Sequence, residues 1–580
     1  NATLCVMVCA QESTLFDEMQ KEIRKLDFKE QELGICCFAD DGLYYFGYIV
    51  LSTDADTLIS FQEVLQRVLT QFAKTKKNVP TLNISLPRPT SLLDPRIGTD
   101  RTSGIVIKML YEGLLRVDPS GRPTPAVAAA VKVSADKKQY IFQLRQTKWT
   151  NGRPVTAHDF AYAWKKVLDP HFKTPYSYLF YPIRNAKRIK LGQLPIEQVG
   201  IIVRDDHTLE VLMEHPAPYF LELTAHWIYS PLCKEVDELN PGWAYYGDDT
   251  YVCNGPFRLA KWNRNSEIQV LKNDLYWEAE AVRTSQINIS IIEDPHRALS
   301  LYERGDLDFI GEPLSEIPHE AFKIRNFENK IITHPITAVH WYECNLQMAP
   351  FSSKKCRQAL AIALSRKDLI EKIFSGIEKP AFSILPPGLS QHKEPYFRDS
   401  NPLLAKQLFH EGLQELGVTF KELGPFSICC SDQPTHHLIA HAASKQWKEI
   451  LGLDCKIEIC KWDRFMEKRL ERAFHIMATT WYSWVYDPSY NLEHLSYPSN
   501  EMNVSGWHNA SYTEYFEKAQ HCLDKKERLS LLHEAENIVM EEIPVIPVFY
   551  YTFKYMKKEH LNNIYLSRLG QIDFKWASVN

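Results

Sequence analysis

Long hydrophobic runs and a strong excess of charge of one sign are both absent from this sequence. No stretch of about 18 consecutive apolar residues occurs, so no transmembrane helix is predicted. A net charge of -5 over 580 residues leaves no overall positive field that would attract nucleic acid or anionic lipid. We therefore expect no nucleic-acid partner.

The sequence signatures of common catalytic and cofactor sites are missing as well. There is no GxxxxGKS or GxxxxGKT, no GxGxxG, no GxSxG and no HExxH, so the main signals of nucleotide, serine-hydrolase and zinc-protease sites are lacking. His437 and His441 stand four residues apart on a predicted helix, which would place two imidazoles on one face. Because two ligands do not make a metal site, a solvated or helix-capping pair is preferred. We expect no enzyme, no metal and no cofactor.

Cysteine motifs are also lacking. The 13 cysteines are an odd number without a CxxC, and Cys36-Cys37 and Cys429-Cys430 are adjacent within strand-like runs. Buried free thiols are therefore preferred over a disulfide framework or a zinc site. The chain begins at Asn1-Ala2 without Met and without a signal-peptide pattern, which is compatible with an export signal that has already been removed.

Aromatic residues are what the sequence has in surplus, with 13 Trp, 28 Tyr and 28 Phe. Such residues fill cores, and they are also what a chain needs to line a large ligand cleft. A chain of 580 residues is too long for one hydrophobic core, so several domains are predicted.

Residues 1–77 are predicted to form a separate small α+β module. Strand patterns cover 3–10, 33–38 and 43–51, the last two flanking an Asp41-Gly42 turn signal, and helical spacing covers 15–26 and 57–77. A structural appendage is the preferred interpretation, and a partner-docking domain is the alternative.

From residue 81 onward short strands alternate with helices. Strands are predicted at 82–86, 140–144, 209–213 and 454–459, and helices at 105–115, 159–168, 354–364, 367–374, 403–416 and 437–451. Thr156 and Ser353 stand where helix N-caps are expected. This mixture predicts an α/β architecture with mixed sheets.

An ordered series of short motifs resembles the oligopeptide- and dipeptide-binding proteins of ABC importers, extracellular solute-binding protein family 5. The sharpest is Trp149–Pro170, WTNGRPVTAHDFAYAWKKVLDP, similar to that family's strand, turn and capped helix. The others, in chain order, are SLLDP (91–95), YEGLL (111–115), DHTLEV (206–211), VCNGPF (252–257), NDLYW (273–277), RQAL (357–360) and IPVIPVFYY (543–551). Each motif alone is loose, and their common order over about residues 81–575 is specific.

The resemblance implies a two-lobed periplasmic-binding-protein fold, class II and of the large peptide-binding type. One lobe would comprise 81–111, 234–337 and 551–580, the other 338–550, with a small accessory domain at 112–233. It further implies a monomeric receptor, periplasmic or anchored to the cell surface as a lipoprotein. That receptor would capture a peptide or peptide-like solute between its lobes and deliver it to an inner-membrane ABC permease.

The resemblance also implies site residues. Tyr176 and Trp462 correspond to aromatic residues that line the cleft, and Trp481 corresponds to the Trp that opens the amine-binding loop. Peptide binders of the family carry an Asp three residues after that Trp, where this chain has Trp484. An enclosed ammonium without a countercharge would cost several kcal/mol, so the ligand-binding candidates include Glu312, Asp487 and Asp100 as replacement carboxylates.

The loop TTWYSWVYDPSY (479–490) is strongly aromatic. We expect at least two of its five aromatic residues to face the ligand; these are Trp481, Tyr482, Trp484, Tyr486 and Tyr490. The missing amine anchor keeps a second hypothesis open, in which the same fold binds a metal chelate, haem or a glycan-bearing solute. A third hypothesis is a cytoplasmic regulator in which a solute-sensing domain is fused to the N-terminal module. Residues 1–77 lack a helix-turn-helix pattern and the chain lacks a basic patch, which argues against DNA binding.

Overall fold

The computed structural model describes residues 2–10, 33–40, 43–52, 80–90, 92–98, 101–118, 121–240, 242–247, 251–323, 329–498, 500 and 502–579. The chain forms two compact units, Asn1–Thr81 and Leu82–Asn580. None of the helices among these residues is long and apolar enough to cross a membrane.

The N-terminal unit contains a three-stranded antiparallel sheet. Its strands are β1 (Ala2–Ala10), β2 (Leu33–Asp40) and β3 (Leu43–Ser52), and β3 lies between the other two. β2 and β3 form the predicted hairpin, with Asp40 opposite Leu43. The helices predicted at 15–26 and 57–77 lie outside the described residues.

The larger unit begins with a four-stranded sheet, which we call the first-lobe sheet. Its order is β11-β12-β13-β4, with β4 (Thr81–Leu86), β11 (Phe257–Asn263), β12 (Glu267–Lys272) and β13 (Gln286–Ile291). The nearby helices are α3 (Arg101–Leu110), α7 (Lys234–Leu239), α8 (Trp243–Tyr246) and α9 (Pro295–Arg304).

The helix predicted at 105–115 starts and ends earlier than expected, since α3 covers Arg101–Leu110. The N–H of Glu112 donates to Oδ1 of Asn254 at 3.0 Å instead of continuing the helix. Leu115 then starts the short strand β5 (Leu115–Val117), which pairs with β6 (Pro123–Pro125).

Residues 128–229 form what we call the accessory region. Its sheet has the order β7-β8-β10-β9, with β7 (Ala128–Val133), β8 (Gln139–Leu144), β9 (Ile201–Asp205) and β10 (Thr208–Leu212). Its helices are α4 (Ala157–Leu168), η1 (Ser177–Phe180), α5 (Ala186–Lys190), η2 (Ile196–Gln198), α6 (Phe220–Leu223) and η3 (Trp227–Tyr229). Thr156 caps α4 as predicted, in a capping box with Asp159.

The second lobe is built on a larger mixed sheet of order β14-β20-β15-β19-β17-β18, with β16 also on β20. The strands are β14 (Phe309–Gly311), β15 (Ile332–Cys344), β16 (Lys379–Pro380), β17 (Phe426–Ser431), β18 (Cys455–Cys460), β19 (Ile476–Tyr482) and β20 (Val545–Lys557). Parallel pairs (β17 with β18 and β19) and antiparallel pairs (β15 with β19 and β20) occur together, which confirms the predicted α/β class with mixed sheets.

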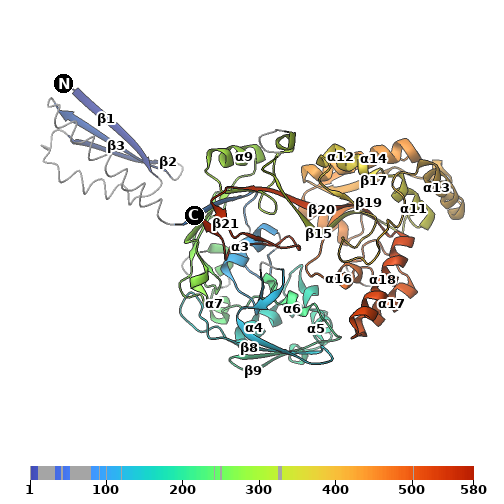
Figure 1. The fold of residues 1–580 in the computed structure, drawn as a ribbon, viewed down its shortest axis with the longest axis horizontal. Coiled ribbons are helices and arrows are strands. Elements are labelled where there is room, and N and C mark those ends of the chain that lie inside the picture. Colours follow the sequence, from blue (N-terminus) through green and yellow to red (C-terminus); the bar gives the residue numbers. More distant parts are fainter. Residues whose placement is uncertain are drawn as a thin grey trace. The chain divides into compact units, whose positions relative to one another are not determined.

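Helices lie on both faces of this sheet, with α12 and α14 on one side and α16 and α18 on the other (Figure 1). They are α11 (Lys354–Ala363), α12 (Arg366–Phe374), α13 (Pro402–Leu416) and α14 (Pro434–Leu451), followed by α15 (Trp462–Leu470), α16 (Pro488–Glu493), α17 (Ala510–His521) and α18 (Lys525–Glu542). Short strands close the chain, β21 (Leu561–Asn562) with β24 (Ser578–Val579) and β22 (Tyr565–Leu566) with β23 (Ile572–Asp573).

Two long strands, β15 and β20, connect the lobes (Figure 1). At one end β20 pairs with β14, next to which Asp308 exchanges hydrogen bonds with Asn83 of the first-lobe sheet at 2.7 and 2.8 Å. At the other end both strands belong to the second-lobe sheet. The register between them shifts between Pro335 and Val339, and an interrupted ladder is a natural place for a sheet to bend.

Candidate functional site

The loop between β19 and α16 brings the second lobe into contact with the accessory region. β19 ends at Tyr482 and Asp487 caps α16, so residues 483–487 span the gap between them. Within this loop the indole of Trp484 packs edge-on against three aromatic rings of the accessory region. The ring centroids lie 6.3 Å from Tyr176, 4.8 Å from His226 and 5.3 Å from Trp227.

We call Tyr176, His226, Trp227 and Trp484 the aromatic box. One wall of the box packs closely against α3. A Cβ at Gly104 of α3 would lie only 2.8 Å from the indole of Trp227, so only glycine permits this approach. His226 and Trp227 are 2% and 7% exposed. Trp484 is half-buried and is the one member that the second lobe contributes.

Two buried donors in the box lack an acceptor within the described part of the chain. Nδ1 of His226 accepts the N–H of Ile228 at 3.3 Å, and burial lowers the pKa of His226 to about 3, so the neutral ring carries its proton on Nε2. That Nε2 and Nε1 of Trp227 have no hydrogen-bond partner among the described residues. A buried donor without an acceptor is costly, and a carbonyl or carboxylate of a solute would satisfy it.

Further contacts join the same two regions beside the box. The N–H of Tyr486 donates to Oε2 of Glu222 in α6 at 2.6 Å, and the hydroxyls of Tyr178 and Tyr490 are 3.1 Å apart. Figure 1 shows α6 and α16 facing one another at this place. The structure is therefore a state in which the second lobe and the accessory region touch.

The carboxylate of Asp487 is already engaged. It caps α16 through the N–H of Ser489 at 2.9 Å, and it accepts two hydrogen bonds from Arg528, both at 2.8 Å. A carboxylate held by a cap and a bidentate ion pair is a weak candidate for a free countercharge.

Glu312 directly follows β14, the strand that pairs with β20, and is not part of the box. Its Oε2 accepts the N–H of Lys554 in β20 at 3.1 Å, and Nζ of Lys554 is 3.9 Å from it. The same Nζ donates to Glu378 at 2.6 Å, and burial raises the pKa of Glu378 to about 7. Lys554 thus links two carboxylates where the two lobes are joined.

The remaining predicted site residues are spread over three environments. Trp481 is 7% exposed and stacks with Trp341 and His494 at 5.7 and 4.6 Å, so it is packed in the second lobe. Tyr482 is half-buried against Tyr551. Trp462 is 46% exposed at the start of α15. Asp100 lies outside the described residues.

The structure brings Tyr176 and Trp484 together, and no ring contact joins Trp462 to them among the described residues. Glu222, His226 and Trp227 are not among the residues predicted from the sequence. His226 and Trp227 belong to the aromatic run AHWIY at 225–229, which is equally typical of a core, and Glu222 lies outside this run.

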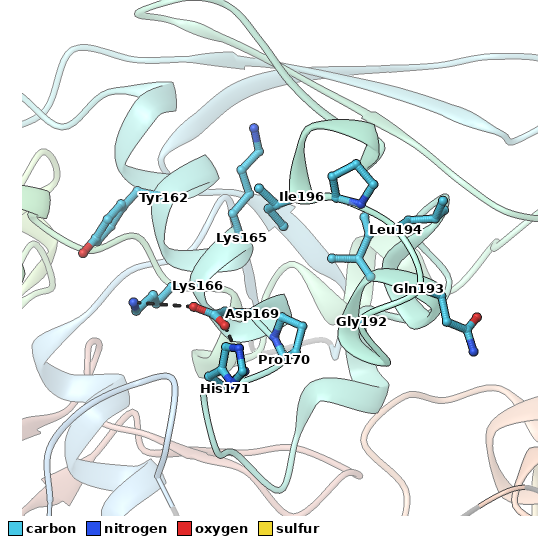
Figure 2. Close-up of a pocket in the computed structure, with 12 residues that line it drawn as sticks. Tyr162, Lys165, Lys166, Asp169, Pro170, His171, Gly192, Gln193, Leu194 and Ile196 are labelled. Carbon is cyan, nitrogen blue, oxygen red and sulfur yellow. Dashed lines mark hydrogen bonds and ion pairs between the residues drawn. The ribbon is translucent and has the colours of Figure 1, made fainter.

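A separate hollow lies on the accessory region. It has a volume of about 810 Å³ and is lined by residues of α4 and by the segment that follows α5 (Figure 2). Lys166 pairs with Asp169 at 3.8 Å on its rim, and Asp169 also accepts the N–H of His171. No residue of the second lobe lines this hollow, so solute bound there would not hold the lobes together.

Metal-ligating side chains are dispersed in the described part of the chain. No group of three or more His, Cys, Asp or Glu side chains there could hold a metal ion. The cysteines from Cys233 onward are free thiols, all buried except Cys522.

Comparison with known proteins identifies relatives over most of the chain. Residues 122–503 match the model of bacterial extracellular solute-binding proteins, family 5 Middle. The oligopeptide-binding protein OppA of Bacillus subtilis is 32% identical over 509 residues, which cover 87% of this chain and 93% of that protein. The dipeptide-binding protein DppE of the same organism is 32% identical, with 85% and 90% covered.

Solved structures show the same fold. OppA of Burkholderia pseudomallei superposes with a TM-score of 0.77 at 27% identity, covering 87% of this chain and 99% of that one. The murein tripeptide-binding protein MppA of Escherichia coli superposes with a TM-score of 0.78 at 25% identity and the same coverage. These similarities confirm the predicted two-lobed periplasmic-binding fold. The predicted limits of the lobes, 81–111 with 234–337 and 551–580, 112–233, and 338–550, remain a prediction, as does the role of residues 1–77.

Proposed function

The chain belongs to the bacterial extracellular solute-binding proteins of family 5, and we propose that it is the receptor of an ABC importer that captures a peptide or peptide-like solute between its lobes. The observation that carries this proposal is the aromatic box, in which Trp484 of the second lobe meets three rings of the accessory region. A ligand that touches both sides favours the closed state by its differential contacts.

The family consists of non-enzymatic solute-binding proteins. We propose that this member also catalyses no reaction, acts as a monomer outside the cytoplasmic membrane, and hands its solute to a membrane permease. Relatives whose names state a periplasmic location and bound peptide support this, among them the Salmonella typhimurium and Escherichia coli oligopeptide-binding proteins.

A second candidate function is favoured by one specific observation. Trp484 stands where peptide binders are expected to carry an acid, and Asp487, the nearest carboxylate in the loop, is paired with Arg528. A free α-ammonium would therefore lack a countercharge in this loop. A blocked peptide or a non-peptide solute fits the loop equally well.

Isothermal titration calorimetry with unmodified and N-acetylated tri- to pentapeptides tests both functions. Capture of peptides predicts one site per chain with a negative heat-capacity change, since apolar surface is buried on closure. Small-angle scattering of the same samples reports the closure. Absence of binding to every peptide class would contradict the peptide proposal.

A further inference from the structure

A smaller pocket lies between the accessory region and the second lobe, and residues 486 and 487 of the loop that carries Trp484 help to line it. Its volume is about 410 Å³. The accessory side contributes Lys137 and the segment around Tyr219 and Glu222, and the second lobe contributes Tyr486 and the start of α18. Because its walls come from both sides, the pocket exists only when these regions are together.

The charges around this pocket are unequal. Asp487 and Arg528 line it but neutralise each other through their two 2.8 Å hydrogen bonds. Lys137 and Lys525 also line it, and among the described residues neither ammonium has a hydrogen-bond or ion-pair partner. The remaining acid, Glu222, already accepts the N–H of Tyr486, and burial raises its pKa. The pocket therefore carries positive charge in excess.

Two hydrogen-bond donors on buried side chains, Arg528 and Tyr219, also line this pocket. Arg528 is only 8% exposed, and its Nε has no acceptor among the described residues, although its two other nitrogens bind Asp487. Tyr219 is 8% exposed, and no described residue shares a hydrogen bond with its hydroxyl. Burial raises the pKa of Tyr219 well above its ordinary value, so the hydroxyl stays a donor at neutral pH.

We propose that this pocket, lined by Lys137, Lys525, Tyr219 and Arg528, binds a carboxylate of the captured solute, either an acidic side chain or the terminal carboxylate. A carboxylate accepts up to four hydrogen bonds and suits a pocket with several donors and two unpaired ammonium groups. The inference rests on the proposed function, since it names the peptides that the receptor prefers.

The test compares peptides that differ in one group. Tripeptides with Glu, Gln or Lys at each position, and their C-terminally amidated counterparts, are titrated into the full chain by calorimetry. The protein variants are the double variant Lys137→Asn with Lys525→Gln, and Lys526→Gln as a matched control. Lys137 has φ of 53°, a conformation that Asn tolerates, and Lys526 is an exposed neighbour of Lys525 that does not line the pocket.

We expect the natural protein to bind one peptide with a Glu side chain, or one with a free terminal carboxylate, on the order of tenfold more tightly than its neutral counterpart. This magnitude is expected because the carboxylate interacts with two partly screened ammonium charges. The double variant should lose this preference and keep its affinity for the neutral peptide, and the control should keep the preference. Comparing the amidated peptides with the Glu series shows which carboxylate is bound.

Two results would overturn the inference, and they differ in what else they overturn. If peptides bind but the natural protein has no preference for the acidic member, or the double variant retains it, the pocket does not bind a carboxylate and the proposed function stands. If no peptide binds the natural protein, the proposed function fails as well. Thermal unfolding of the double variant within about 2 °C of the natural protein shows that only surface charge was changed.

Discussion

Replacing Trp484 by Ala removes the only contribution of the second lobe to the aromatic box. Three edge-to-face contacts are lost, at centroid distances of 6.3, 4.8 and 5.3 Å. Each such aromatic pair contributes about 0.5–1.5 kcal/mol. Because Trp484 is only half-buried, we use the lower part of that range and expect a loss of about 2 kcal/mol, which corresponds to roughly a 30-fold weaker affinity.

The assay is calorimetric titration of the natural protein, Trp484→Ala and Trp484→Phe with one bound peptide. Phe keeps a ring at the same place and should recover a large part of the affinity. Thermal unfolding of the same proteins shows whether a substitution lowers the stability of the fold as well as the affinity for the peptide. Unchanged affinity together with a lower unfolding temperature would refute the reasoning, because it would make Trp484 a core residue and not a contact that acts on closure.

Three further predictions concern charge. Trp484→Asp should restore a countercharge and make a free-amino peptide bind more tightly than its N-acetylated form; calorimetry that finds no such preference would contradict the assignment of the loop. For Glu378, burial raises the pKa to about 7 in the folded protein against 4.5 ordinarily, so its stabilising contribution is full below about pH 4.5 and is lost as the pH rises toward 7. In the natural protein the free energy of unfolding should therefore fall by up to about 3 kcal/mol between pH 4.5 and 7, and Glu378→Gln should remove this fall. Urea titration at several pH values measures it, and an unaltered pH profile of the variant would exclude Glu378 as its cause. Asp487→Ala breaks a buried ion pair and removes the cap of α16, so a loss of about 3 kcal/mol of unfolding free energy is expected by the same method, and a loss below about 1 kcal/mol would show that the pair is not structurally important.

Local patterns predicted local structure well. The Thr156 cap, the hairpin around residues 41–42 and the long helices of the second lobe follow from short-range capping and periodicity, and the structure has them. The helix at 105–115 was misplaced because its end is set by Asn254, which lies about 140 residues away in the chain. The ordered family motifs predicted the two-lobed fold, which periodicity alone could not.

The candidate site was only partly predictable for the same reason. Trp484 was identified because it replaces an expected acid, and Tyr176 because of the resemblance. Glu222 and Trp227 come within reach of the 483–487 loop only through folding, at sequence separations above 250 residues. For Asp487, the Asp-Pro-Ser sequence indicates an N-cap, but its pairing with Arg528 is visible only in three dimensions.

The central claim is that this protein captures a peptide or peptide-like solute between its lobes without transforming it. Native mass spectrometry of the protein purified from its own cells tests this most directly, since a closed receptor retains its solute. The account predicts a 1:1 complex whose released ligand fragments as a peptide, with acidic members enriched. A discrete metal or haem mass, or a ligand without amide bonds, would contradict it.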